Sequence, residues 1–266
     1  MASRKQRRLL DAVAAIQQRW GPNALRRLGQ AATATPVPHI PTSFPALDRA
    51  LGIGGLPRGK VSELVGLATS GKTTLALKFL AQAQALRPGS GQALGGQVGY
   101  LDQARYFDPD YAHRCGLDLS HLLVGTPNDL QEALSMAEAL VRDAGLVALV
   151  FDILDDFWTD PDAGRRLTSL LGRLAAPLAR SGTALLFLRA ESPAERRAAW
   201  PSPALSALAH SAAVRLQLTR ERWLRRHGDI RGYQARVEVL KNRLGPAGQA
   251  VSVKIEFNGA VRGNGL

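Results

Sequence analysis

The sequence predicts an α/β fold with a doubly wound, mainly parallel sheet and antiparallel edge strands. Apolar runs of strand length alternate with helical patterns through the middle of the chain. A glycine-rich phosphate-binding pattern joins the first strand to the first helix, and three segments of alternating polarity follow near the end. The 266 residues, 45% of them hydrophobic, suffice for one large domain with a buried core.

A basic segment, residues 1–31, precedes this domain. The apolar residues that recur at helical spacing are Leu9, Leu10, Val13, Ile16 and Trp20. Gly21 and Pro22 should end the helix. The segment contains several basic residues but only one acidic residue, Asp11. A solvated helix or a DNA-facing arm fits this charge, but the apolar stripe favours a helix that packs on another surface.

The proline-rich residues 32–45 are interpreted as a linker, so the core is expected over residues 46–266. The expected core strands are 60–66, 97–101, 121–125, 146–152 and 183–189, with edge strands at 212–219, 234–241 and 251–257. The expected helices are 72–86, about 109–115, 128–145 and 162–182. In the third of these helices Asn128 is the expected N-cap, and Gly145 suits the C-terminal end.

Charge and cysteine content narrow the class of protein. Lys and Arg number 34 against 22 Asp and Glu, which gives a net charge of +12 and a pI near 10.8. This balance favours a polyanionic partner, nucleic acid first, although heavy use of arginine alone would also produce it. The single cysteine, Cys115, excludes an intramolecular disulfide and makes the cytoplasm the expected compartment. No apolar run approaches the roughly 20 residues that cross a bilayer, so no membrane association is expected.

The segment "GLATSGKTT" carries the strongest chemical signal. Gly66, Gly71, Lys72 and Thr73 fit the phosphate-loop pattern between an expected strand and helix. Lys72 would reach the terminal phosphates, and the Thr73 hydroxyl would coordinate Mg²⁺. Asp152 ends an apolar strand, where it could hold the magnesium shell. The sequence therefore predicts ATP and Mg²⁺ as ligands, and the remaining hydroxyl residues expected to contact the nucleotide are Thr69, Ser70 and Thr74.

Three ordered segments resemble the bacterial RecA recombinase family, namely residues 40–84, 100–124 and 236–245. The resemblance extends from about Leu9 to about Val261. It implies a RecA-like P-loop core, ATP binding, and a role in DNA recombination or repair. It also implies that the N-terminal helix and a following strand pack on a neighbouring subunit.

The departures from the family pattern point to a specialised relative. The sequence ends soon after the expected core, so we expect no counterpart of the separate C-terminal domain of RecA. The segments 152–187 and 189–203, which correspond to the two DNA-contacting loops, are shorter, and the γ-phosphate-sensing glutamine falls on Ala190. We therefore expect a RecA paralogue of DNA repair or damage tolerance, including the SOS response. In outline it is similar to ImuA-type accessory proteins of mutagenic translesion synthesis.

The resemblance also assigns roles around the nucleotide. The family's water-activating glutamate falls on Ala104, so ATP hydrolysis is expected to be weak or absent unless Asp102 or Glu191 substitutes. Asp108 and Tyr111 match the residues that cradle adenine. The two cations that reach the ATP of the next subunit correspond to Lys241 and Arg243.

Two basic segments are candidates for contact with single-stranded DNA. The candidate residues are Arg196, Arg197, Arg222, Arg225 and Arg226. Residues 220–233 also fit a hairpin connection with Gly228–Asp229 as its turn, and a basic hairpin can still lie against DNA.

The alternative hypotheses for the function of the protein are an active DNA-dependent ATPase recombinase, a P-loop small-molecule kinase and a scaffold stabilised by nucleotide. The expected protein partners are RecA-type subunits, further copies of this chain, or a translesion polymerase complex.

Overall fold

The computed structural model describes residues 4–21, 24–25, 36–86, 96–143, 145–152, 162–191, 202–257 and 261–263. The chain divides into two compact units, residues 1–36 and residues 37–266. Within the described ranges, no helix has the length and apolar character needed to span a bilayer.

The first unit contains one long helix, α1 (Arg4–Trp20), which confirms the helical pattern seen in the sequence. None of its residues is buried, and Leu9, Leu10 and Trp20 are exposed. Gly21 follows the helix with a φ of 94°, and its N–H donates to the Gln17 carbonyl. The strand expected after this helix lies outside the described residues.

The second unit begins earlier than the sequence predicted. Residues 37–45, expected to belong to the linker, lie in the compact unit, because Ile40 and Phe44 are fully buried in its core. Strand β1 (His39–Ile40) pairs with β2 (Leu56–Pro57). Pro45 occupies the first turn of helix α2 (Pro45–Leu51), where its missing N–H has no cost. Prolines here therefore shape an extended segment that packs on the core.

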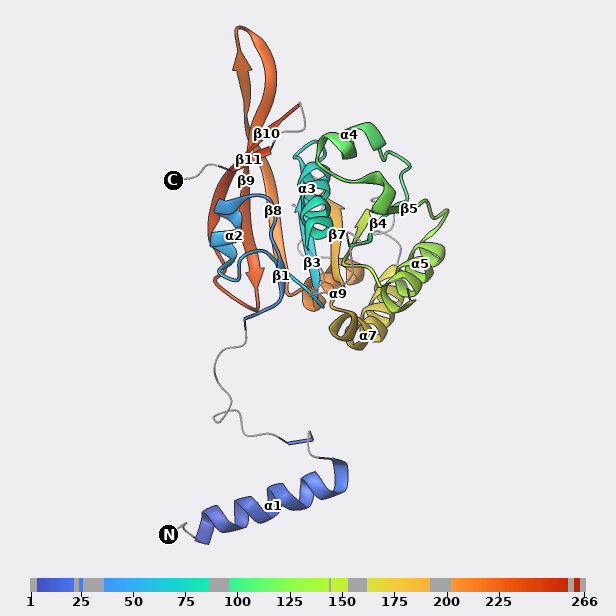
Figure 1. The fold of residues 1–266 in the computed structure, drawn as a ribbon, viewed down its shortest axis with the longest axis vertical. Coiled ribbons are helices and arrows are strands. Elements are labelled where there is room, and N and C mark those ends of the chain that lie inside the picture. The colour runs from blue at the N-terminus through green and yellow to red at the C-terminus, as the bar shows by residue number, and fades with distance from the viewer. Residues whose placement is uncertain are drawn as a thin grey trace. The chain divides into compact units, whose positions relative to one another are not determined.

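A nine-stranded sheet forms the centre of this unit, in the order β11-β10-β9-β8-β3-β7-β6-β4-β5 (Figure 1). Its strands are β3 (Val61–Gly66), β4 (Val98–Asp102), β5 (Leu122–Gly125), β6 (Ala148–Asp152), β7 (Ala184–Ala190), β8 (Val214–Arg226), β9 (Asp229–Asn242), β10 (Ala250–Glu256) and β11 (Val261–Gly263). Strands β3 to β8 pair parallel with one another, whereas the β8–β9, β9–β10 and β10–β11 pairs are antiparallel. The predicted doubly wound sheet with antiparallel edge strands is confirmed.

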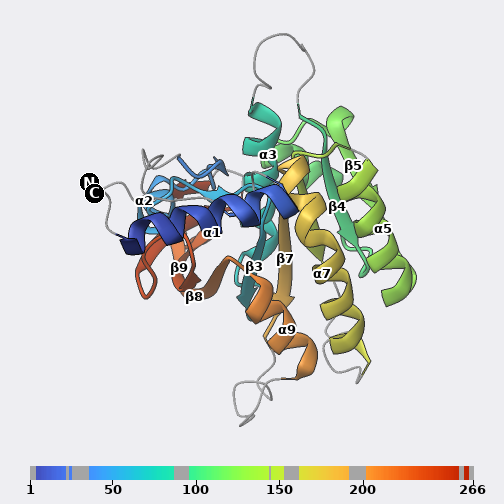
Figure 2. The same cartoon turned by 90° about the horizontal axis from the view of Figure 1, so that it is seen from below.

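Helices cover both faces of the sheet (Figures 1 and 2). Helix α3 (Lys72–Ala85) and α2 pack on one face, where Leu64, Leu75 and Phe79 belong to one hydrophobic cluster. Helices α5 (Leu130–Asp143), α7 (Ala163–Ser181) and α9 (Pro203–Ser211) cover the other face around a second cluster. The short α4 (Pro109–Arg114) and a 3₁₀ turn (Leu119–His121) connect β4 to β5.

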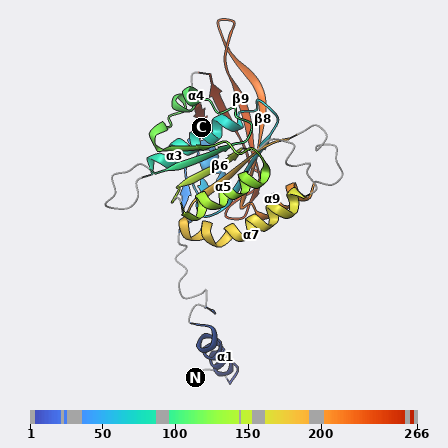
Figure 3. The ribbon, with the colours of Figure 1, turned by 90° about the vertical axis from the view of Figure 1, so that its right-hand side faces the viewer.

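Two local predictions need correction. The N-cap of α5 is Asp129 rather than Asn128, because the Asp129 carboxylate accepts from the Glu132 N–H. The β8–β9 strands continue through residues expected to connect them, so they form a long hairpin (Figure 3). Its turn is His227–Gly228, both with positive φ, rather than Gly228–Asp229. Two such residues give the mirror-image turn that matches the twist of paired strands.

Candidate nucleotide site

The phosphate loop connects the carboxyl end of β3 to the first turn of α3. Thr69 and Gly71 have φ angles of 60° and 102°, so the loop turns twice through the left-handed region. A Cβ on Gly71 would lie 2.6 Å from the Tyr233 hydroxyl, which restricts this position to glycine. Gly71 caps α3 without any side-chain hydrogen bond, so the backbone N–H groups at this helix end suit an anion. The Lys72 ammonium donates to the carbonyls of Gly66 and Leu67, both at 2.9 Å, and so lies over the same loop.

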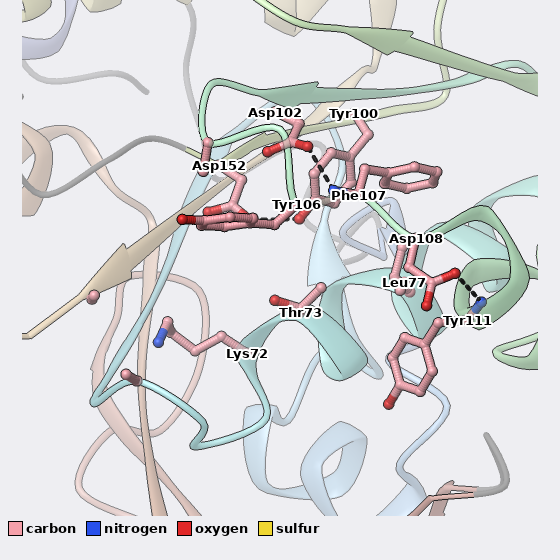
Figure 4. Close-up of a pocket in the computed structure, with 13 residues that line it drawn as sticks. Lys72, Thr73, Leu77, Tyr100, Asp102, Tyr106, Phe107, Asp108, Tyr111 and Asp152 are labelled. Carbon is pink, nitrogen blue, oxygen red and sulfur yellow. Dashed lines mark hydrogen bonds between the residues drawn. The ribbon is translucent and has the colours of Figure 1, made fainter.

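A cavity of about 320 Å³ opens beside this loop, at the carboxyl ends of the parallel strands (Figure 4). That edge of a doubly wound sheet is where such folds bind ligands. The residues around the cavity are Ala68, Lys72, Thr73, Leu77, Tyr100, Asp102, Ala104, Tyr106, Phe107, Asp108, Tyr111, Asp152 and Ala190. The cavity therefore brings together five of the predicted nucleotide and metal residues, Lys72, Thr73, Asp108, Tyr111 and Asp152. Outside the lining, in the end of β3, the adjoining loop and the first turn of α3, lie the predicted residues Gly66, Thr69, Ser70, Gly71 and Thr74.

One wall of the cavity suits Mg²⁺. The Asp152 carboxylate accepts a hydrogen bond of 2.5 Å from the Tyr100 hydroxyl, and Thr73 lies beside the same hydroxyl. Burial, followed by the charge of Asp152, raises the pKa of Tyr100 well above its ordinary value, so this hydroxyl remains a donor. A carboxylate and a hydroxyl are hard oxygen ligands, which Mg²⁺ prefers together with phosphate oxygens. The side chains present thus fit a Mg²⁺–triphosphate ligand.

The other wall suits a planar base. Asp108 caps α4 by accepting from the Tyr111 N–H at 3.0 Å through one carboxylate oxygen. The Tyr111 hydroxyl lies 2.6 Å from the Thr74 hydroxyl, which fixes the ring near the first turn of α3. The Arg114 guanidinium lies 5.7 Å from the centre of the Tyr111 ring. Asp108, Tyr111 and the apolar Leu77 lie together at this end of the cavity (Figure 4).

Comparison with known proteins places the chain in a family. The RecA N-terminal domain model matches residues 7–160, more than half of the chain. The chain belongs to the RecA family. Protein RecA of Frankia casuarinae is 34% identical over 98% of this chain and 77% of its own length. Protein RecA of Rubrobacter xylanophilus is 32% identical over 100% of this chain and 79% of its own length.

Ala104, on which the family resemblance placed the catalytic glutamate, lines the cavity with only a methyl group. Of its two suggested substitutes, Asp102 lines the cavity, is buried, and accepts from the Phe107 N–H at 2.7 Å. Glu191 does not line it, and its carboxylate accepts instead from Gln217 at 3.2 Å. Asp102 is therefore the better placed of the two. Ala190, on which the family resemblance placed the phosphate-sensing glutamine, also lines the cavity and has no polar side-chain group.

The two cations assigned to the nucleotide of a neighbouring subunit lie far from this chain's own phosphate loop. Lys241 lies near the end of β9 and Arg243 directly follows that strand, beside the start of β8, whereas the loop follows the last residue of β3. Both donate to carbonyl oxygens at the end of α9, Lys241 to Ala209 at 2.6 Å and both to His210. They are thus not brought together with the other nucleotide residues within one chain.

Three of the five arginines predicted to contact DNA lie in the part of the chain that the structure describes. Arg222, Arg225 and Arg226 lie on the β8–β9 hairpin and are exposed. Arg222 donates to Gln234 on the opposite strand. Arg196 and Arg197 lie outside the described residues.

Sequence reasoning missed three tyrosines of this site. Tyr100 lies in the predicted strand 97–101, and its position two residues before Asp102 is the one local signal that it borders the cavity. Tyr106 is 86% exposed at the cavity edge, following Arg105 with a φ of 60°. Tyr233 reaches Gly71 from β9, and only the tertiary fold brings those two residues together.

Proposed function

We propose that this RecA-family protein binds ATP and Mg²⁺ and acts in DNA recombination, repair or damage tolerance, with weak or no ATP hydrolysis. The cavity supports this, because it joins the phosphate loop, Asp152 and the Asp108–Tyr111 wall but presents a methyl group at Ala104. The chain would then use ATP chiefly as a structural ligand. Its proposed partners are single-stranded DNA and either RecA-type subunits or further copies of this chain.

Slow hydrolysis follows from the missing carboxylate. A positioned general base contributes about 10²–10⁴ in rate, and it must lie within hydrogen-bond reach of the attacking water. Asp102 is buried, and one of its oxygens already accepts from the Phe107 N–H. That bond orients the carboxylate toward its own turn. The competing function is a DNA-dependent ATPase, which the position of Asp102 beside the cavity favours.

Steady-state ATP hydrolysis with single-stranded DNA separates these two functions. We expect low turnover in the wild type and a gain in Ala104→Glu. Lys72→Ala serves as the control for contaminating ATPase. Robust wild-type turnover that disappears in Asp102→Asn, with no gain in Ala104→Glu, would establish the ATPase instead.

The DNA-binding part is tested by filter binding at two salt concentrations, with and without ATP. Changing Arg222, Arg225 and Arg226 together to Gln should weaken binding and lower the salt slope by about two, since each phosphate contact to a single strand contributes about 0.7. A matched variant replaces Arg49, Arg166 and Arg180, which are exposed and lie on helices. Equal losses in the two variants would show that net charge alone attracts the DNA. Absence of wild-type binding at low salt would remove this part of the proposal.

A further inference from the structure

The turn that follows β4 is held on both sides of Tyr106. On one side the chain passes through Arg105, whose φ is 60° and whose guanidinium donates to the Asn128 side chain at 2.7 Å. On the other side the Phe107 N–H donates to the Asp102 carboxylate at 2.7 Å. A non-glycine residue with positive φ needs such surrounding contacts to maintain it. The position of Tyr106 is therefore set by its neighbours in the chain.

Tyr106 borders the nucleotide cavity although its side chain is 86% exposed. In Figure 4 its ring lies on the side of Asp152 and Lys72, whereas Tyr111 lies at the end of the cavity that suits a base. Within the described part of the chain, Tyr106 has no hydrogen bond and no ring contact. Single exposed apolar groups are ordinary on protein surfaces. What distinguishes this one is its place on the rim of a ligand cavity, where a bound ligand would give the phenol a partner.

The other hydroxyl groups of the cavity already have partners or roles. Among the described residues, four hydroxyls line the cavity, those of Thr73, Tyr100, Tyr106 and Tyr111. Tyr100 donates to Asp152, and Tyr111 shares a hydrogen bond with Thr74. Thr73 is the expected Mg²⁺ ligand. The Tyr106 phenol is thus the hydroxyl left to donate to the ligand itself.

A terminal phosphate would otherwise meet few donors at this end of the cavity. Ala104 and Ala190, which the family resemblance assigns to the water-activating and phosphate-sensing positions, supply only methyl groups. Two carboxylates, Asp102 and Asp152, line the same cavity, and negative charges repel phosphate. Lys72 supplies a positive charge. A phenol donates to an anionic oxygen without a charge of its own, and hydrogen bonds to charged acceptors are the stronger ones.

We propose that Tyr106 recognises the terminal phosphate of the bound nucleotide, with its phenol donating a hydrogen bond to a γ-phosphate oxygen. Tyr106 thereby makes the site selective for a nucleoside triphosphate, because a diphosphate offers no acceptor at this place. The residue stands in for a phosphate sensor in a chain that has alanine at the family's position for one. This inference rests on the proposed function, since it requires nucleotide in the cavity.

The test compares the affinities of the full chain for ADP and for the β,γ-imido analogue of ATP, which resists hydrolysis. Both are measured with Mg²⁺ by displacement of fluorescent methylanthraniloyl-ADP. The wild type should prefer the triphosphate. In Tyr106→Phe that preference should fall about tenfold, the lower end of what a hydrogen bond to a charged group contributes, while the affinity for ADP stays at the wild-type value. Tyr106→Ala should lose the preference to the same extent, because the ring supplies no donor.

Tyr111→Phe is the matched control, because it removes a cavity hydroxyl at the base end, where the two nucleotides are identical. Any loss of affinity in that variant should be equal for both nucleotides, so the preference should remain at the wild-type value. An unchanged preference in Tyr106→Phe overturns the proposal. A loss found only in Tyr106→Ala overturns it as well, since the ring rather than the phenol would then be responsible.

Light scattering with the imido analogue shows whether the Tyr106 variants assemble as the wild type does. Loss of preference together with loss of assembly would assign Tyr106 to a subunit contact and overturn the proposal. A wild type that binds both nucleotides without preferring the triphosphate would also overturn it, while leaving the proposed function intact. Failure of the proposed function looks different: the wild type would bind neither nucleotide, or Lys72→Ala would bind both equally well.

Discussion

Tyr100 lies between the two groups expected to hold Mg²⁺. Its hydroxyl donates to the Asp152 carboxylate and lies beside Thr73, and its raised pKa keeps the proton on the phenol. Residues that orient a metal ligand in this way typically change metal affinity about 10–100-fold when altered. Tyr100 therefore determines which way the carboxylate faces, although it need not touch the metal.

The Tyr100→Phe variant should need about tenfold more Mg²⁺ for half-maximal nucleotide binding. The phenylalanine ring should still fill the buried position, where the centre of the Tyr100 ring lies 5.2 Å from the centre of the Phe107 ring, so the fold should persist. The midpoint is read by titrating Mg²⁺ into protein with fluorescent ATP. Tyr111→Phe is the control, because that hydroxyl lies beside Thr74 rather than Asp152. An unchanged midpoint in Tyr100→Phe would remove Tyr100 from the metal wall.

At the scale of elements, the phenol of Tyr233, in β9 of the β8–β9 hairpin, titrates in the alkaline range. Burial, with a smaller effect from Tyr111, raises the pKa of Tyr233 from 10.0 to about 12. Below pH 10 the phenol is protonated in both the folded and the unfolded chain. Between pH 10 and pH 12 the unfolded chain loses the proton first, so the free energy of unfolding falls as pH rises.

Replacing Tyr233 with Phe should remove this alkaline loss. The wild type should lose about 2 kcal/mol more than Tyr233→Phe between pH 9 and pH 12, since one unit of pKa corresponds to about 1.4 kcal/mol. Urea unfolding at the two pH values measures the difference. Tyr106→Phe is the control, because Tyr106 is 86% exposed and should show the wild-type loss. Parallel losses in wild type and Tyr233→Phe would contradict the assignment.

The elements also show what the sequence could and could not specify. Strands β3, β6 and β7 are buried on both faces, so they appear as continuous apolar runs and were predicted within one or two residues. The outer halves of β8 and β9 carry exposed arginines with no apolar alternation, so hydrophobic periodicity missed them. At α5 the sequence predicts Asn128 as the N-cap, but the next residue, Asp129, is of a type that caps helices equally well, and the observed hydrogen bond identifies Asp129.

The residues of the candidate site likewise separate into those with a local sequence signal and those without one. Lys72, Thr73 and Asp152 were predictable because local strand–loop–helix chemistry fixes their places. The contacts of Arg220 and Tyr233 with the loop depend on how far β8 and β9 extend beyond β3, which is a property of the whole sheet. The pairing of residues so distant in sequence has no local signal.

At the scale of the whole molecule, two features of the chain bear on contact with a neighbouring subunit. Helix α1 has an exposed apolar face with Leu9, Leu10 and Trp20, and none of its residues is buried. Lys241 and Arg243 sit at the opposite end of the sheet from the phosphate loop, at the C-terminal end of α9. Cations are favourable at a helix C-terminus, so a structural role alone would account for their position. The family resemblance assigns them instead to the nucleotide of a neighbouring subunit.

A composite site predicts complementation between two defective chains. Lys72→Ala lacks the loop cation, and the double variant Lys241→Gln, Arg243→Gln lacks the cations offered to a neighbour, so each alone should bind fluorescent ATP weakly. In a mixture, some interfaces join an intact loop from the double variant to intact cations from Lys72→Ala, because a head-to-tail interface uses different surfaces of its two subunits. Binding should therefore rise above the average of the separate proteins.

Deleting residues 1–30 from both variants should abolish the gain, since α1 is proposed to dock on the neighbour. The remaining compact unit, residues 37–266, should stay folded as a monomer. Light scattering with ATP would verify that the full-length chains assemble and the shortened chains do not. If the mixture binds only the average of its components, or if the deletion leaves the assembly state unchanged, Lys241 and Arg243 serve α9 alone. The nucleotide site would then be complete within one chain.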